Sequence, residues 1–457
     1  MLLALVAVPI LARYLHRIGY GQYTLAITIA TIAVGLSEGG VGVVALREYT
    51  TTSGSAREVS LANVLGIRML LSAVSVVGAI AFAALAGYSL SIVLATGLAS
   101  LGLSAQATQT VFTAPLQAGL RFGWVAATDL LRQGVATVLV IALVIAGAKL
   151  AALVAILIPA SFAALGLTIW LVRRHMPLRP RFDLGISLPL LRDTVPFAVA
   201  IALGVTYFRL TIVLVSLIAG ANELGIFSYS YRIVEVFIGL PSLLIGAAYP
   251  ILARAARDDP QRLGYAVARM FELAVIVGVW LAMCLELGAD FAVRVIGGQA
   301  AVPAGAVLQI QGLAVMGTFV AGALAFPLLA LRRYRAVMYT NLFGLLATVA
   351  LGAALIPRLG ARGGALATIG GEVTLAIVAA VALRRARPSL RLPLGALPAA
   401  AVAGGAGVAI GNFVGIQAFL EIFVASVVYA GTLALLGRFP QEVGHALRPH
   451  RRAERAS

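Results

Sequence analysis

The chain has 457 residues, of which 61% are hydrophobic and 11% are charged, and its mean hydropathy is +1.02. This composition indicates a protein built mostly of membrane-spanning segments and excludes a soluble enzyme. The net charge of +17 does not indicate nucleic-acid binding, because the basic residues lie in short turns between apolar runs and form no contiguous basic face.

Apolar runs of about 20 residues, the length that crosses a bilayer, follow one another along the chain. The alternating pattern of β-barrel strands is absent from the sequence. We therefore predict an all-α polytopic membrane protein with about 14 transmembrane helices. The first run is short, and we expect that helix to be cut by the start of the chain or to continue past Arg13. The predicted helices cover residues 1–12, 22–46, 61–86, 90–114, 123–147, 150–172, 194–219, 227–253, 263–288, 303–330, 336–356, 363–383, 393–411 and 416–437.

Most arginines lie in the loops after even-numbered predicted helices and in the C-terminal tail. The positive-inside rule therefore places both termini in the cytoplasm. A weak internal repeat divides the chain, because GYGQY at 19–23 and ELGIF at 223–227 each open a helix that runs to a basic turn. Two six-helix bundles related by a pseudo-twofold axis along the membrane normal follow from this repeat. The predicted parts are an N-terminal bundle (1–172), a cytoplasmic linker (173–192), a C-terminal bundle (193–384), an appended helix pair (385–437) and a basic cytoplasmic tail (438–457).

Several motifs together resemble those of one family. LIPRLGARGGALAT at 355–368, followed by Glu372, resembles the turn between helices eleven and twelve of bacterial polysaccharide exporters. Further similar segments are PILARYL at 9–15, GQY at 21–23, EGGVG at 38–42 and GIF at 225–227. The family is that of the O-antigen and lipid-linked oligosaccharide flippases, in the multidrug/oligosaccharidyl-lipid/polysaccharide exporter superfamily. One departure is Glu38, where the family pattern leads us to expect an aspartate.

The resemblance implies two six-helix bundles, alternating access, and a bacterial cytoplasmic membrane location. It also implies a polyprenyl-(pyro)phosphate-linked glycan as substrate, held among membrane lipids by an undecaprenyl-type carrier. We expect a monomer that is not an enzyme and moves this substrate from the cytoplasmic to the outer leaflet. The sequence predicts no cofactor and no metal site.

Three charged residues, Arg209, Arg232 and Glu235, are predicted at similar depth in the outer half of the membrane. A guanidinium is always ionised and forms paired hydrogen bonds with phosphate, so the two arginines are candidates for binding the anionic headgroup. The alternative is that Arg232 pairs with Glu235 one turn away, and that Arg209 neutralises a neighbouring acid or extends to the interface.

Arg13 and Arg47 lie at opposite ends of the first two predicted helices, and by resemblance are candidate gate or headgroup contacts, with ordinary interfacial anchoring as the alternative. Glu38 is a further candidate because nearby glycines would let a cavity-lining helix bend. Asp129 and Arg132, one turn apart, are expected to form a structural ion pair. Arg68 is expected close to the cytoplasmic end of its helix, with its side chain extended to the interface.

No phosphate-binding loop of the G-x-x-x-x-G-K-[ST] type occurs, so direct use of ATP is not expected. The membrane potential can drive an anion outward, and H+ or Na+ is the candidate coupling ion. A cation-coupled multidrug antiporter of the same superfamily is one alternative, although the two arginines favour an anionic cargo. A membrane glycan polymerase or ligase is the other, although every outward loop is short.

Overall fold

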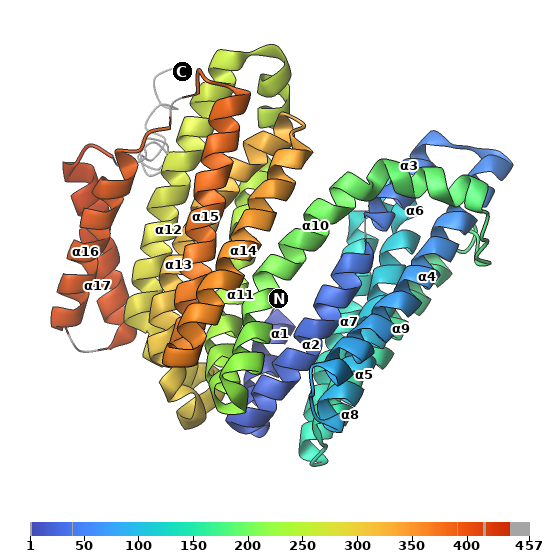
Figure 1. Cartoon of the computed structure of the whole chain (residues 1–457), viewed down its shortest axis with the longest axis horizontal. Helices are drawn as coiled ribbons and strands as arrows, with labels where there is room; N and C mark the ends of the chain where they lie inside the picture. Colours follow the sequence, from blue (N-terminus) through green and yellow to red (C-terminus); the bar gives the residue numbers. More distant parts are fainter. Residues whose placement is uncertain (1, 39, 391, 415–416, 439–457) are drawn as a thin grey trace, which may run out of the picture. The chain divides into compact units, whose positions relative to one another are not determined.

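The computed structural model describes residues 2–38, 40–390, 392–414 and 417–438, and these residues form helices joined by short turns (Figure 1). In a bilayer, a helix satisfies all its backbone hydrogen bonds internally, which is why long apolar runs become helices. The helices are α1 (Leu2–Tyr14), α2 (His16–Glu38), α3 (Val41–Thr51), α4 (Gly54–Leu85), α5 (Leu90–Phe112), α6 (Ala114–Ala118), α7 (Phe122–Ile145), α8 (Leu150–Ala155), α9 (Leu157–Val172), α10 (Leu184–Ile218), α11 (Gly220–Asp258), α12 (Pro260–Gly297), the 3-10 helix η1 (Gly298–Ala304), α13 (Gly305–Ala330), α14 (Tyr334–Leu359), α15 (Ala361–Ala386), α16 (Ala396–Val414) and α17 (Ala418–Leu435).

Among the described residues, each predicted range is mostly helical, but several helices start earlier than predicted. α4 begins at Gly54, not at 61, and α10 begins at Leu184, not at 194. The start of α10 has a local cause, because the Asp183 side chain accepts a hydrogen bond from the backbone N–H of Gly185 and caps the helix. Within the described residues, 11 helical segments are long and apolar enough to cross a membrane, and the count of about 14 spans stays a prediction.

The chain forms two compact units. Unit 1 contains Met1–Tyr229, Arg294–Pro303 and Val337–Ala367, and unit 2 contains Ser230–Val293, Ala304–Ala336 and Thr368–Ser457. The division into bundles at 172 and 193, with an appended pair from 385, stays a prediction, and residues 439–457 of the predicted tail lie outside the described part of the chain.

In unit 1, α5 packs against α2, α4 and α9. Small side chains let these helices approach closely, as in the buried cluster of Ala26, Ala30, Ala95 and Ala99. The connection before α10 also packs on α4, because Asn63 Oδ1 accepts a hydrogen bond from the backbone N–H of Asp183 at 2.7 Å. All residues from 60 to 68 of α4 are buried as a result.

In unit 2, the pair α16–α17 packs on α12. The Tyr429 hydroxyl donates to the carbonyl oxygen of Ile276 at 2.7 Å, and Trp280 Nε1 donates to Ser426 Oγ at 3.0 Å. Gly407 permits a close approach, because a Cβ there would lie 2.5 Å from Met283 Sδ. These contacts fix the helix pair to the rest of its unit.

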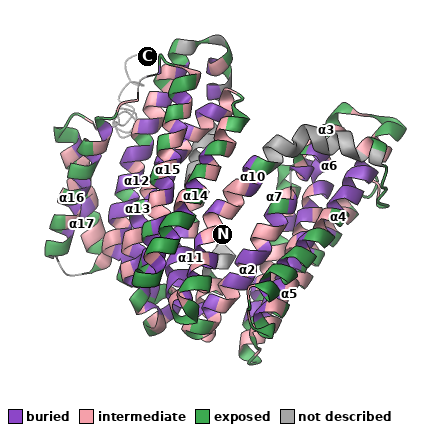
Figure 2. Cartoon of the chain, viewed as in Figure 1, coloured by how far each residue is buried: buried purple, intermediate pink, exposed green. Residues whose placement is uncertain are grey.

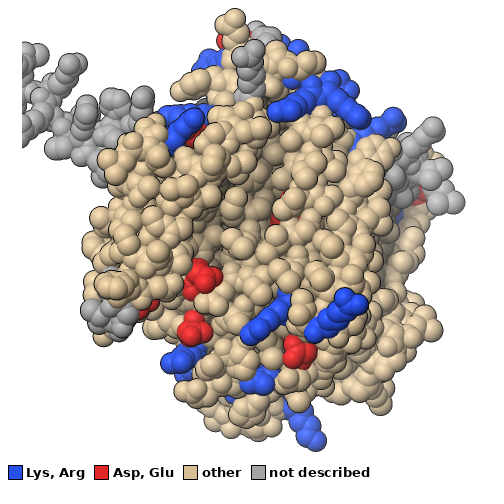
Figure 3. All heavy atoms as spheres, turned by 60° about the vertical axis from the view of Figure 1, so that its left-hand side comes forward, with Lys and Arg blue, Asp and Glu red and all other residues tan. Residues whose placement is uncertain are grey.

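Most helices carry both buried and exposed residues along their length (Figure 2). Many exposed side chains are large and apolar, for example Leu85, Val77 and Phe423. On the face shown in Figure 3, lysine and arginine side chains gather near the top and in the lower part of the view, and the area between them is mostly uncharged. Apolar exposure between charged ends fits helices that face lipid, so the chain is a multi-pass membrane protein.

Candidate substrate-binding residues

Arg13 and Arg17 join the predicted outer ends of several helices of unit 1. Arg13 Nη2 donates to the carbonyl oxygen of Val295 at 2.8 Å, and Arg17 Nε donates to that of Ala300 at 3.0 Å. Arg17 Nη1 also donates to Asn222 Oδ1 at 3.2 Å. These partners belong to the end of α12, to η1 and to the start of α11. Arg13 Nη2 also donates to the carbonyl oxygen of Arg294 at 3.5 Å, so each arginine has two acceptors. Sequence reasoning selected Arg13 and did not select Arg17.

Two glycines bring α2 and α11 into backbone contact near the same ends. A Cβ on Gly21 would lie 2.9 Å from the backbone nitrogen of Gly225. The rings of Tyr20 and Tyr229 stack beside them with centroids 4.9 Å apart, and the Tyr229 hydroxyl donates to the carbonyl oxygen of Ala12. All of these segments flank turns predicted to lie outside, so their contacts agree with the predicted alternation of the loops.

The family-like turn at 355–368 ends α14 and starts α15. Glu223 Oε2 accepts a hydrogen bond from the backbone N–H of Ala361 at 2.8 Å, which places a carboxylate at the N-terminus of α15. Gly360, with φ 56, makes room for this carboxylate, because a Cβ there would collide with Glu223 Oε2. This contact explains one glycine of the motif in physical terms.

Arg209 lies in α10, nine residues before Ile218, which corresponds to about 13 Å from the predicted outer end of the helix. Its side chain is partly buried. Its neighbours Thr206 and Leu210 line a pocket of unit 1. The structure thus places Arg209 within the span, as predicted, and its role in binding stays a prediction.

Arg232 and Glu235 form an ion pair in α11, with Nη1 and Oε2 2.7 Å apart. Of the six candidate residues, these two are in direct contact, as the alternative interpretation anticipated. Both side chains keep substantial exposure, at 36% and 25%. The described protein therefore does not enclose this ion pair.

Arg47 and Glu38 lie near the predicted cytoplasmic ends of their helices. Arg47 is exposed and donates from Nε and Nη2 to Glu48 Oε1, both at 3.2 Å. The other oxygen of Glu48 accepts a hydrogen bond from Ser60. Glu38 is the last residue of α2, and Gly40, with φ 73, turns the chain into α3. The expected bend beside Glu38 is therefore present.

Arg68 does not extend to the interface, so that prediction is wrong. Its side chain is completely buried. It lies fourteen residues after the first residue of α4, a distance of about 21 Å along the helix axis. The error arose because the helix begins at Gly54, in a polar stretch that hydropathy alone does not assign to a span. Nε donates to Ser72 Oγ at 3.2 Å, whereas Nη1 and Nη2 have no hydrogen-bond partner within the described chain.

Two further acids within the helices, Asp129 and Glu272, are paired with arginines. Arg132 Nη2 and Asp129 Oδ1 are 3.3 Å apart, which confirms the predicted pair in α7. Glu272 in α12 accepts hydrogen bonds from Arg269 at 2.6 Å and lies 3.6 Å from Arg438. No group of three or more His, Cys, Asp or Glu in the described ranges is arranged to hold a metal ion.

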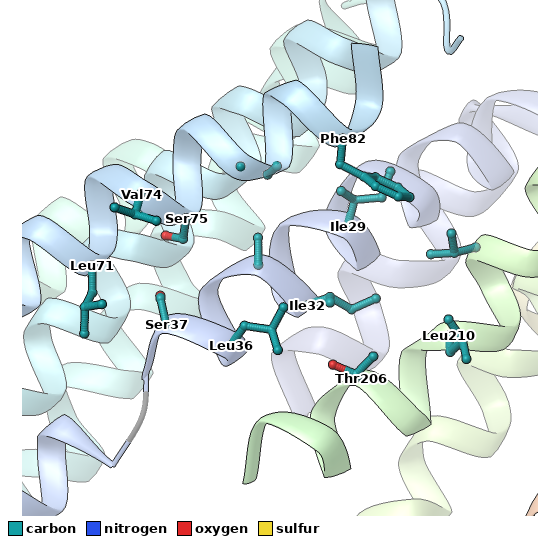
Figure 4. A pocket seen from close by; sticks show the side chains of 14 residues that line it. Ile29, Ile32, Leu36, Ser37, Leu71, Val74, Ser75, Phe82, Thr206 and Leu210 are labelled. Atoms are coloured by element: carbon teal, nitrogen blue, oxygen red, sulfur yellow. The ribbon is translucent and has the colours of Figure 1, made fainter. Parts of the chain in front are cut away.

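A pocket of about 470 Å³ lies between α2, α4 and α10 of unit 1 (Figure 4). Its walls are almost entirely aliphatic, with Phe82 at one end and Ser37 and Leu71 toward the other. Sequence reasoning did not predict it, because its residues come from three helices far apart in the chain. The lining residues are Ile29, Ile32, Ala33, Leu36, Ser37, Leu71, Val74, Ser75, Gly78, Ala79, Phe82, Thr206, Leu210 and Val213.

The fold is similar to that of solved transporters, and the sequence matches a family model. The fold is similar to that of a lipid II flippase MurJ in an inward closed conformation, with 13% identity, coverage of 96% of each chain and a TM-score of 0.76. It is also similar to an inward-facing multidrug resistance MATE family transporter of the MOP superfamily, with 14% identity, coverage of 85% of this chain and 96% of that one, and a TM-score of 0.71. No curated protein matches the sequence. Residues 1–256, more than half of the chain, match the family model described as "Polysaccharide biosynthesis protein", and the chain belongs to that family.

Proposed function

We propose that this protein is a flippase that moves a lipid-linked oligosaccharide or polysaccharide precursor from the cytoplasmic to the outer leaflet by alternating access. Membership of the polysaccharide biosynthesis family and the similarity in fold to a lipid II flippase support the proposal. The observation that carries it is the position of Arg209 within the apolar part of α10, together with that of Arg232 twelve residues into α11. An ionised side chain costs about 2.5–3.5 kcal/mol at the centre of a membrane, so such residues are retained for a function.

In this proposal, Arg209 and Arg232 bind the (pyro)phosphate of the substrate. A guanidinium offers a phosphate two charge-assisted hydrogen bonds in one plane. Arg232 already holds one carboxylate, that of Glu235, and a phosphate can replace it because the described protein does not enclose the pair. Glu235 then compensates the charge of the guanidinium when no substrate is bound.

Arg13, Arg47 and Glu38 are proposed to act at the two rims of the transport path. On the outer side, Arg13 and Arg17 hold α1 and α2 to α11, α12 and η1, and these contacts must break before a large headgroup can leave. On the cytoplasmic side, Arg47 is exposed beside Glu48 and can meet an incoming anion. The proposed orientation has both termini in the cytoplasm, in a bacterial inner membrane.

The proposed driving force is electrical. Outward movement of an anion from a negative interior gains about 2.3 kcal/mol per charge per 100 mV. H+ or Na+ stays the alternative coupling ion, and we propose that the protein acts as a monomer without a catalytic step. Collapsing the membrane potential in vesicles with an ionophore should then slow flipping severalfold, whereas an unchanged rate would rule out electrical drive.

The test of function uses the purified full chain in vesicles that contain a fluorescent polyprenyl-diphosphate-linked saccharide. Flipping is followed by the fraction of label that a membrane-impermeant quencher reaches with time. We expect Arg209→Met and Arg232→Met to slow flipping at least tenfold, and Glu235→Gln to slow it less. Arg362→Met, which removes an exposed arginine of the α14–α15 turn, is the matched control.

No flipping by the wild-type protein, or wild-type rates in both arginine variants, would contradict the proposed mechanism. Efflux of cationic dyes by cells that express the chain would instead indicate the multidrug antiporter.

A further inference from the structure

The pocket between α2, α4 and α10 offers no free hydroxyl donor to an occupant. Its three hydroxyl groups all donate to carbonyl oxygens of their own helices: Ser37 to Val34, Ser75 to Ser72 and Thr206 to Ala202. A saccharide placed here would find only three hydroxyl oxygens as acceptors and no free hydroxyl donor, so most of its polar groups would have no partner. The pocket therefore suits an apolar occupant, and its volume of about 470 Å³ lies in the range of small-ligand sites.

Arg68 lies on α4 just before the pocket-lining residues of that helix. Side chains on a helix usually lean toward its N-terminus, but Arg68 Nε reaches forward to Ser72 Oγ. Ser72 lies between Leu71 and Ser75, which both line the pocket, and Ser75 donates to its carbonyl. Arg68 thus stands about one helical turn, or roughly 5 Å, from the pocket lining along α4.

The buried guanidinium of Arg68 lacks partners for its two terminal nitrogens. Both Nη1 and Nη2 are inaccessible and make no hydrogen bond within the described ranges. Glu38 lies within electrostatic reach, but the pair forms no ion pair within 4.0 Å. Burying a charged group whose two terminal nitrogens make no hydrogen bond is costly, so its retention calls for an anion that these nitrogens meet at some stage of the cycle.

We infer that this pocket binds a stretch of the polyprenyl chain of the lipid carrier, with Arg68 contacting the phosphate at the inner end of the pocket. The inference rests on the proposed function, because it assumes a prenyl-linked anionic substrate. An anion-binding residue at one end and an aliphatic cleft beyond it match the two parts of such a molecule. In the predicted orientation, α4 runs outward, so the head lies toward the cytoplasm and the chain toward the outside. This is the polarity of a lipid in the cytoplasmic leaflet, before it is flipped.

One pocket residue permits a clean blocking variant. Gly78 lines the pocket, and a Cβ built on it meets no atom within 4 Å. Gly78→Leu should therefore fill the pocket without a backbone clash. Gly166→Leu in α9 is the matched control, because Gly166 is also an exposed helical glycine with open space around a Cβ.

The probe is a polyprenyl monophosphate with a photoreactive group on its chain, added to vesicles that contain the full-length protein. After illumination, labelled peptides are mapped by mass spectrometry. We expect labelling within residues 71–82 and 206–213, at least a tenfold loss in Gly78→Leu, and wild-type labelling in Gly166→Leu. Arg68→Met should remove the preference for polyprenyl phosphate over uncharged polyprenol. The thermal midpoint in detergent shows whether each variant is folded.

Other outcomes would overturn the inference. Equal competition by phosphatidylglycerol would mean that the pocket takes ordinary acyl chains, and labelling that persists in Gly78→Leu would place the prenyl chain elsewhere. A folded Arg68→Met protein that still prefers the phosphate would remove Arg68 from the site. The flipping assay separates this inference from the proposed function. If the wild-type protein moves the lipid-linked saccharide but is not labelled in the pocket, only the assignment of the pocket is refuted. If it is labelled in the pocket but does not move the saccharide, only the proposed function is refuted.

Discussion

Arg17 Nε on α2 donates a hydrogen bond to the main-chain carbonyl of Ala300 in η1, 3.0 Å away and 283 positions later in the chain. The same guanidinium also holds Asn222 at the start of α11. One side chain therefore connects three segments whose turns are all predicted to lie outside the membrane. This arrangement makes the outer end of unit 1 a natural place for a gate.

Removing Arg17 should loosen this end of the unit. Arg17→Met loses two hydrogen bonds from a charged donor, each worth about 1.5–3 kcal/mol where it is protected from water and less where it is exposed. We expect a lower thermal midpoint in detergent and faster amide hydrogen exchange in η1 and in the first turn of α11. Arg362→Met, on an exposed arginine of another outer turn, should leave both unchanged; equal effects in the two variants would show that the Arg17 contacts are unimportant.

The backbone contact between α2 and α11 should tolerate no side chain. A Cβ on Gly225 would collide with the carbonyl oxygen of Arg17, so Gly225→Ala must push the two helices apart. Overpacking of this kind costs about 1–3 kcal/mol. Gly134→Ala in α7, where a Cβ meets open space, should instead be neutral or stabilising by up to about 1 kcal/mol. Chemical unfolding in detergent compares the two, and equal stability would show that α2 and α11 are not in tight contact.

The cap of α10 can be tested on its own. Asp183→Ala removes the hydrogen bond from Gly185 N–H to the Asp183 side chain, with an expected cost of about 1 kcal/mol. The loss should appear as faster amide hydrogen exchange in the first turn of α10. Asp183→Asn keeps a side-chain acceptor and should exchange nearly as the wild type does. Unchanged exchange in the alanine variant would mean that the start of α10 depends on other contacts.

Tyr88, in the turn between α4 and α5, should make stability sensitive to alkaline pH. Burial raises the pKa of its hydroxyl above the ordinary value of 10.0, and the hydrogen bond with Ser216 works in the opposite direction. Because the folded-state pKa is the higher one, this contribution to stability is complete below pH 10 and is lost as the pH rises through the raised pKa.

We therefore expect the thermal midpoint of the wild type to fall more steeply above pH 10 than that of Tyr88→Phe. Tyr265→Phe, at an exposed tyrosine of α12, serves as control and should follow the wild type. Parallel curves for wild type and Tyr88→Phe would contradict the assignment.

The positions of the helices were predictable because crossing a bilayer is a local requirement. A run of about 20 apolar residues must satisfy its own backbone, and the basic turns indicate which side each run starts from. The pair Asp129–Arg132 was predictable for the same reason, since both residues lie on one face of a single helix. The ends of α4 and α10 were not, because their first turns are polar or depend on a capping side chain.

The sequence by itself determined the class of protein, its helical segments and the arginines placed within them, because hydropathy and charge act residue by residue along the chain. Only the tertiary structure decided which of those charges are enclosed and what surrounds them. Arg68 is buried because helices and a connection from distant parts of the chain cover α4, as the contact between Asn63 and Asp183 illustrates. The pocket beside it exists because three helices, remote in sequence, pack with a gap that no single-helix pattern encodes.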